Sequence, residues 1–151
     1  MVLTGFAFGF GLFGGKSDKE LIKIALDEAI TASKEGRPGG VLDFLSRKFE
    51  VNGQQYGSGD IAKTIKEMKP DVTIEKPDPT VNGDSATITS PVRLSVLTMG
   101  MNISEVTITF ARETGTKWLI FPTKKWRMVE VDVPDNVVQE VQSQYGGMSQ
   151  L

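Results

Sequence analysis

The spacing of apolar residues changes once along this chain, near Pro70, and this change limits the possible folds more than any other feature. Before Pro70 the spacing is helical, since Ile61, Ile65 and Met68 lie four and three residues apart. An earlier stripe with helical spacing consists of Leu21, Ile24, Ala25, Leu26, Ala29 and Ile30. After Pro70 apolar and polar residues alternate, as in half-buried strands. Helices followed by a meander of strands predict an α+β fold, with N-terminal helices packed on a curved antiparallel sheet.

Capping and breaking residues set the expected ends of the helices. The run Ser17-Asp18-Lys19-Glu20 is a capping box, and Gly36 is a stop signal, so the first helix is expected between them. A second, short helix is expected over residues 41–48. The third helix is capped by Ser58 or Asp60 and ends at the proline that follows it.

Turn residues divide the second half of the chain into long strands. The pair Asn82-Gly83 predicts a tight hairpin, and further turns are expected near Gly100 and at Gly115. A bulge is expected near Pro122, because proline cannot donate to a strand ladder. The expected strands cover residues 72–74, 86–97, 103–112 and 117–133.

These strands have one apolar and one polar face. The apolar face carries Ala86, Ile88, Val92, Leu94, Val96, Val106, Ile108 and Phe110. The polar face carries Thr87, Thr89, Ser95, Thr107 and Thr109, together with Arg93 and Glu105. If the helices cover the apolar face, these strands bring no titratable group to the interior, which is then a dry core or an apolar pocket. On the polar face, Glu105 is expected to pair with Arg93 or Lys117.

Composition excludes several kinds of chemistry. The 151 residues include 0 Cys and 0 His, so thiolate or imidazole nucleophiles, bases and metal ligands are not available. The formal net charge of −2 provides no field for a polyanion, and no nucleic-acid partner is expected. No acidic loop with alternating ligands is present for calcium, and no cofactor is expected. Only carboxylates, Lys, Tyr or Ser could carry acid–base or nucleophilic work.

The chain is expected to form one domain over residues 16–145, with a last short helix over 134–144 and a loose end over 146–151. Residues 1–15 form an uncharged run with Phe6, Phe8, Phe10 and Phe13 among five glycines. This run is too short for a membrane span and lacks the marks of a signal peptide. It is the trimmed end of an export or membrane anchor, a tail that covers an apolar groove, an oligomer contact, or a tail without function. An anchor would place the protein outside the cytoplasm or on a membrane; otherwise it is cytoplasmic.

Single residues offer few candidates for a site. Asp43 lies among apolar neighbours of the expected second helix and could point into the interior as a base, although a solvated helix face explains it as well. The candidates for a ligand pocket are Tyr56, Trp118, Trp126 and Arg127, because aromatic side chains at its mouth could hold an apolar ligand. Packing in the core or at the rim is the simpler interpretation of these residues.

The order of the elements resembles the nuclear-transport-factor-2-like superfamily, a cone-shaped fold. Residues 49–57 (FEVNGQQYG) and the helix 61–68 look like its small strand and third helix, and residues 109–120, with Trp118 after the turn, look like its hairpin. The resemblance covers about residues 17–133. It implies a cone whose members include isomerases, dehydratases, hydrolases, cyclases and non-catalytic binding or dimerising domains. Their common Asp–His arrangement cannot be carried over, because this chain has no histidine.

Three hypotheses follow for the function. The first is a non-catalytic domain that binds a partner or a small apolar molecule as a homodimer. The polar sheet face could be the dimer contact, or it could simply be exposed to solvent. The alternative is a small isomerase, dehydratase or cyclase that uses Asp43 as base, with Tyr56 or Trp126 shaping the pocket. The third is a structural dimerisation module without a pocket.

Overall fold

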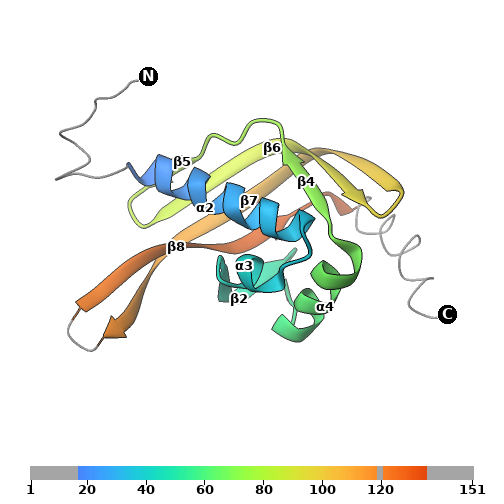
Figure 1. Cartoon of the computed structure of the whole chain (residues 1–151). Helices are drawn as coiled ribbons and strands as arrows, with labels where there is room; N and C mark the ends of the chain where they lie inside the picture. Colours follow the sequence, from blue (N-terminus) through green and yellow to red (C-terminus); the bar gives the residue numbers. More distant parts are fainter. Residues whose placement is uncertain (1–16, 119–120, 136–151) are drawn as a thin grey trace, which may run out of the picture.

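The computed structural model describes residues 17–118 and 121–135, which form three helices and a single seven-stranded sheet (Figure 1). The helices are α2 (Asp18–Lys34), α3 (Pro38–Leu42) and α4 (Ser58–Met68). The strands are β2 (Leu45–Val51), β3 (Gln54–Gln55), β4 (Asp71–Ile74), β5 (Thr80–Asn82), β6 (Ser85–Val96), β7 (Met99–Trp118) and β8 (Phe121–Asp132). The strand order is β3-β2-β8-β7-β6-β4, and β5 also pairs with β6. The predicted α+β architecture is confirmed, although β2 and β8 run parallel.

Helix α2 begins as its sequence predicts. The Glu20 amide donates to the Ser17 hydroxyl at 3.2 Å, and the Ser17 amide donates to the Glu20 carboxylate at 3.4 Å. The helix ends before Gly36, which has a φ of +72°. The buried stripe differs from the expected one, because Leu21 and Ile24 are exposed. The side chains that α2 buries are Ile22, Leu26, Ala29, Ala32 and Ser33.

The expected second helix over residues 41–48 is wrong in its second half. Helix α3 ends at Leu42, and the chain continues as strand β2, in which Leu45 pairs with Met128 of β8. The Met128 amide donates to the Phe44 carbonyl at 2.8 Å where this pairing starts. Hydrogen bonds to a strand more than eighty residues away therefore decide the conformation here. The third helix begins after Gly57, without the side-chain cap expected from Ser58 or Asp60.

The hairpin at Asn82-Gly83 is confirmed, since Asn82 pairs with Ser85 across the turn. The other two expected turns are displaced. Strand β7 already begins at Met99, so Gly100 lies within it, opposite Ser95. Gly115 also lies inside β7, opposite Thr123, because pairing with β8 continues past it. The expected strand 103–112 is thus the longer β7, and the expected strand 117–133 is the shorter β8. The proposed tail 1–15 and nearly all of the last segments, 134–144 and 146–151, lie outside the described residues.

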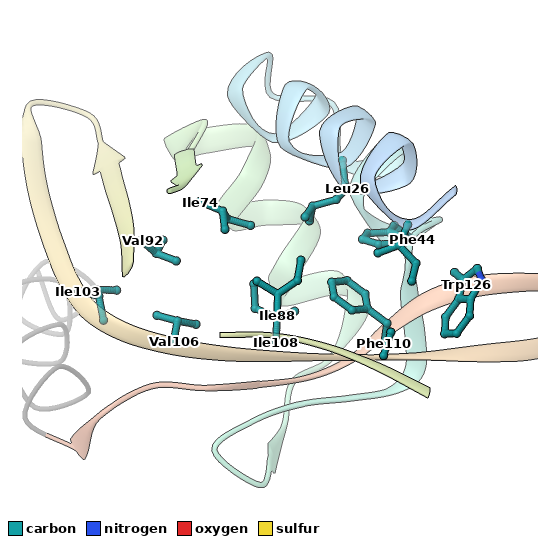
Figure 2. Close-up of a cluster of buried hydrophobic side chains, with 13 residues drawn as sticks. Leu26, Phe44, Ile74, Ile88, Val92, Ile103, Val106, Ile108, Phe110 and Trp126 are labelled. Carbon is teal, nitrogen blue, oxygen red and sulfur yellow. The ribbon is translucent and has the colours of Figure 1, made fainter. Parts of the chain in front are cut away.

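The core lies between α2 and the inner face of the sheet (Figure 2). Every second residue of β6 points inward, as the alternation predicts, and Ala86, Ile88 and Val92 are buried. A bulge sits opposite Pro91, where Ser90 pairs with Val106 but Val92 pairs with Ile103. The ring of Phe44 packs against the fully buried Phe110, with 5.8 Å between the ring centroids. The helices thus cover one face of the sheet and leave the polar face uncovered by the described residues.

Candidate functional site

An apolar cavity of about 350 Å³, partly open to solvent, lies between α2 and the inner face of the sheet. Helix α2 contributes Leu26, Ala29, Ile30 and Ser33, which lie at the spacing of one helix face. The sheet contributes side chains from β2, β4, β6, β7 and β8. They include Ile74, Val92, Ile103, Val106, Ile108 and Met128. Figure 2 shows how Leu26 of the helix faces side chains from the strands beneath it, among them Ile74, Val92, Ile103, Val106 and Ile108. We call this space the interior cavity.

The side wall of the interior cavity comes from the segment that departs from the expected helix. Because β2 follows α3 directly, Phe44, Leu45 and Phe49 are brought from there to the cavity, and Ile61 of α4 joins them. Ala29 leaves room in the middle of the α2 stripe, where a larger side chain would reach toward the sheet. The cavity therefore exists because a short helix–strand corner holds α2 and the sheet apart while small residues face the gap.

The wall of the interior cavity is almost entirely hydrocarbon. No Asp, Glu, Lys or Arg is among the described residues that line it, and Ser33 is the single lining residue with a hydroxyl. A charged ligand would lose its hydration there without gaining a partner, which is strongly unfavourable. A neutral apolar molecule loses little hydration free energy there, and it gains dispersion contacts with the wall. The geometry therefore suits binding of apolar matter, and the wall itself provides no acid, base or charged nucleophile.

Asp43 lies outside the interior cavity. Helix α3 has ended before it, and its side chain is 70% exposed, with the Lys125 ammonium 2.5 Å from its carboxylate. The side chain is thus solvated, as the simpler interpretation of Asp43 expects, and the alternative in which it points into the cone is corrected, because α3 ends at Leu42 and the chain turns toward β2 there. Asp43 instead belongs to a solvent-facing ion pair between the α3–β2 corner and β8.

Tyr56 lies beside a second, open groove of about 520 Å³ on the outer side of β2 and α4. Its side chain is 45% exposed. Leu45, Phe49 and Ile61 line both this groove and the interior cavity. A single layer of apolar side chains therefore separates Tyr56 from the cavity, and the tyrosine ring is not part of the cavity wall.

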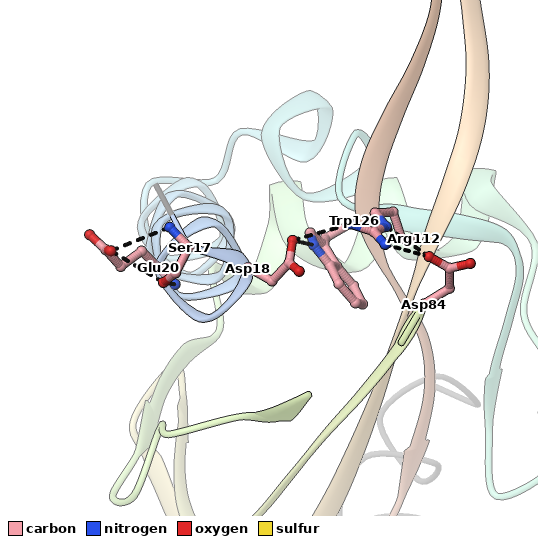
Figure 3. Close-up of polar contacts among 6 residues, drawn as sticks. All are labelled: Ser17, Asp18, Glu20, Asp84, Arg112 and Trp126. Carbon is pink, nitrogen blue, oxygen red and sulfur yellow. Dashed lines mark hydrogen bonds and ion pairs between the residues drawn. The ribbon is translucent and has the colours of Figure 1, made fainter. Parts of the chain in front are cut away.

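Trp126 is buried at 4% exposure and belongs to the core, at the end of the sheet near the start of α2. Its indole N–H donates to the Asp18 carboxylate at 3.1 Å, and the Arg112 guanidinium lies 5.5 Å from the ring centroid (Figure 3). Arg112 also donates to Asp84 at 2.9 and 2.6 Å. The hydrogen bond to Asp84 raises the pKa of Arg112, with a smaller effect from Asp18. This group ties α2 to β7, to β8 and to the turn between β5 and β6, and its polar atoms are already partnered.

The other two candidates also lie away from the interior cavity. Arg127 lies 3.4 Å from the Glu113 carboxylate and donates to the Asp43 carbonyl at 3.2 Å. Trp118 stands opposite Phe121 near the far end of β7, ten residues beyond Ile108, or about 33 Å along the strand. The four pocket candidates therefore do not converge on one site.

Of the two expected partners of Glu105, Arg93 is corrected, and the side chain of Lys117 lies outside the described part of the chain. Arg93 lies 4.0 Å from the Glu75 carboxylate and stands opposite Asn102 in the sheet. The bulge at Pro91 displaces Glu105 from the position that simple alternation gives it.

Sequence reasoning missed Ser33 and Met128 as lining residues. Ser33 lies seven residues after Leu26, so an extension of the apolar stripe at helical spacing could have included it. Within residues 17–118 and 121–135 there is no group of three acidic side chains that could hold a metal ion. No helix of the same residues is long and apolar enough to cross a membrane.

No protein-family profile and no curated protein matches this sequence. Solved structures do match. An NTF2-like protein of unknown function from Shewanella oneidensis has a TM-score of 0.59 at 11% identity, over 79% of this chain and 100% of that one. An NTF2-like protein of unknown function from Pseudomonas putida has a TM-score of 0.53 at 10% identity, over 76% and 83%. An LEH-like epoxide hydrolase from M. tuberculosis has a TM-score of 0.51 at 12% identity, over 77% and 83%.

These similarities extend over most of the chain at identities that establish the fold alone. They agree with the helices, the short strand, the third helix and the long paired strands described above, and they confirm the fold expected from the sequence. The chain has the cone-shaped fold of the nuclear-transport-factor-2-like (NTF2-like) superfamily.

Proposed function

We propose that this domain binds a neutral, predominantly apolar small molecule in the interior cavity and does not transform it. The observation that carries the proposal is the wall itself. Apolar side chains from α2 and the inner sheet face line about 350 Å³, and no titratable side chain of the described residues reaches that space. Such a cavity falls within the size range of small-molecule sites.

The size of the cavity limits the ligand. An apolar cavity of about 150 Å³ accommodates benzene, so this one accepts a molecule of about twice that size. Binding would fill a space in which the lining side chains now lack contacts on one side, and it would stabilise the folded state by mass action. A ligand of this kind is a compact aliphatic or aromatic molecule without charge.

The enzyme alternative has less support. One structural neighbour is an LEH-like epoxide hydrolase, which shows that this fold can carry catalysis. Acid–base chemistry needs a titratable group within hydrogen-bond reach of the ligand. The carboxylate considered for that role, Asp43, is 70% exposed and paired with Lys125 outside the cavity. The hydrocarbon wall therefore favours binding over turnover.

We also propose that the domain associates as a homodimer through its polar sheet face. The described helices all cover the opposite face (Figure 1), and the hydroxyls of Thr89 and Thr107 lie 3.5 Å apart on neighbouring strands of the uncovered one. A surface of short β-branched side chains can pack against a second copy with little loss of side-chain entropy. The variant Thr89→Arg should convert a dimer to a monomer in analytical ultracentrifugation. A wild-type protein that sediments as a monomer at micromolar concentration would refute the dimer.

Filling the cavity tests the binding proposal. Ala29→Leu adds three carbon atoms to the α2 side of the cavity, whereas Ala62→Leu makes the same change on α4, away from the cavity lining. Calorimetric titration with naphthalene and with 1-octanol should show binding to the wild type and to Ala62→Leu. Binding to Ala29→Leu should weaken at least about tenfold, because the ligand would have to displace the new side chain. Equal binding by both variants, or no binding of either probe to folded wild type, contradicts the proposal.

A further inference from the structure

Ser33 introduces the one hydroxyl into a wall that is otherwise hydrocarbon. It is 8% exposed and lies at the last position of the α2 stripe that faces the interior cavity. Polar side chains in such surroundings are unfavourable unless they are hydrogen-bonded. The way in which Ser33 is bonded therefore determines which polar group of a ligand the cavity can accept.

The single proton of the Ser33 hydroxyl is already in use. Oγ donates to the carbonyl of Pro70 at 2.7 Å, in the link between α4 and β4. A hydroxyl oxygen also has two lone pairs that can accept. Within the part of the chain that the structure describes, no N–H or O–H group donates to this oxygen. Donation to Pro70 also polarises the hydroxyl, which makes its oxygen a better acceptor.

We propose that the Ser33 Oγ accepts a hydrogen bond from the ligand, so that the cavity prefers neutral molecules with an apolar body and one hydroxyl or N–H donor. This inference rests on the proposed binding function and specifies its ligand class. A ligand that only accepts hydrogen bonds, such as an ether, cannot use Ser33, because the proton is committed to Pro70. A carboxylate finds neither a proton nor a cation on the described wall.

A purely structural role for Ser33 makes a different prediction. Its bond to Pro70 joins α2 to β4, close to the exposed ion pair of Lys34 and Asp71, whose charged atoms are 4.0 Å apart. If this hydrogen bond were the whole role of Ser33, removal of the hydroxyl would lower the affinity for all ligands equally, because it would destabilise the site. If Ser33 accepts from the ligand, removal affects only those ligands that donate.

Ser90 provides a matched control. It is also buried, at 2% exposure, and its hydroxyl also donates to a proline carbonyl at 2.7 Å, that of Pro91. In contrast to Ser33, it already accepts a hydrogen bond, from the Lys76 amide at 2.8 Å, and it does not line the interior cavity. Ser90→Ala therefore removes a comparable structural bond without altering the cavity wall.

The experiment compares 1-octanol with its isomer 1-methoxyheptane and with octanoate, by calorimetric titration of wild type, Ser33→Ala and Ser90→Ala. We expect Ser33→Ala to lower the affinity for 1-octanol about fivefold, which is the effect of one neutral hydrogen bond. The affinity for 1-methoxyheptane should change by less than about twofold. Ser90→Ala should leave the ratio of the two affinities unchanged. Octanoate should bind most weakly to the wild type. If Ser33→Ala fails to fold, Ser33→Cys replaces it, since a thiol is a poor acceptor.

The outcomes separate the two proposals. If neither the alcohol nor the ether binds to the folded wild type, the proposed binding function is wrong, and this inference fails with it. If both bind but Ser33→Ala weakens them equally, or weakens neither, the cavity binds apolar ligands and the role of Ser33 is overturned. Tighter binding of octanoate than of 1-octanol also overturns it.

Discussion

The indole N–H of Trp126 on β8 donates to the carboxylate of Asp18, the first residue of α2, at 3.1 Å. This bond fixes one end of the helix that forms the roof of the interior cavity. The same carboxylate oxygen accepts from Arg112 at 3.3 Å. A single oxygen thus holds the start of the first described helix to two strands from the other end of the sequence.

Asp18→Ala should destabilise the protein by about 1–3 kcal/mol, because the buried indole N–H loses its acceptor. Trp126 fluorescence during urea unfolding measures the change. Asp27→Ala, which removes an exposed carboxylate from the same helix, should stay within about 0.5 kcal/mol of wild type. Equal effects of the two substitutions would show that the Trp126–Asp18 bond contributes nothing.

Gly40→Ala should destabilise the protein by about 1–3 kcal/mol through overpacking. A Cβ at Gly40 would lie 2.6 Å from the Cβ of Ala32, which is buried at 1% exposure on α2 and cannot move aside easily. Gly39→Ala is the matched control in the same short helix, since its Cβ would meet no atom within 4 Å. Thermal unfolding of both variants tests this, and a melting temperature of Gly40→Ala at or above that of Gly39→Ala would contradict it.

Leu97→Asn should stabilise the protein by about 1 kcal/mol. Leu97 occupies the β6–β7 turn with a φ of +57°, a conformation that is unfavourable for leucine and better tolerated by asparagine. The side chain is 58% exposed, so the substitution sacrifices little packing. The urea midpoint reports the gain, and Thr98→Asn at the next position serves as the control. An unchanged or lower midpoint for Leu97→Asn would mean that the exposed leucine makes a compensating contact.

Glu130→Gln should stabilise the protein at pH 7 and lose this advantage at about pH 4. Repulsion by Asp132, then desolvation and repulsion by Glu50, raise the pKa of Glu130 above its ordinary 4.5. The folded state therefore favours the protonated carboxyl, and the stability from this group falls as the pH rises through that raised pKa. Urea midpoints at the two pH values test the sign. Glu105→Gln, on another strand, is the control, and a pH-independent gain for Glu130→Gln would argue against the repulsion.

The sequence predicts the fold class because the change of apolar spacing near Pro70 is a local property of each element. The strand 45–51 could not be found in the same way, since the hydrogen bonds of β2 go to β8. Short apolar runs next to a helix have no period of their own that would separate a last helical turn from a strand. The turn expected at Gly115 fails for the same reason, because the partner strand keeps it extended.

The candidate site was predictable only in its chemistry. Alternation along β6 and β7 correctly indicates which side chains face inward and that none of them can titrate. It does not indicate whether those side chains fill the space beneath α2. That depends on how far the α3–β2 corner holds the helix from the sheet. Three of the candidates for a ligand pocket, Tyr56, Trp126 and Arg127, follow from the groups that their side chains can bind. Their positions in the structure depend on pairing across the sheet, which residue type does not reveal.

The residues around the interior cavity run from Leu26 to Val133, nearly the whole described chain. During synthesis, the apolar sides of α2 and α4 leave the ribosome long before the strands that will cover them. The nascent chain therefore carries exposed apolar stripes until β8 has emerged and β2 can join it. The binding cavity and the burial of these apolar stripes are thus acquired together and late, because both require β8 in the sheet.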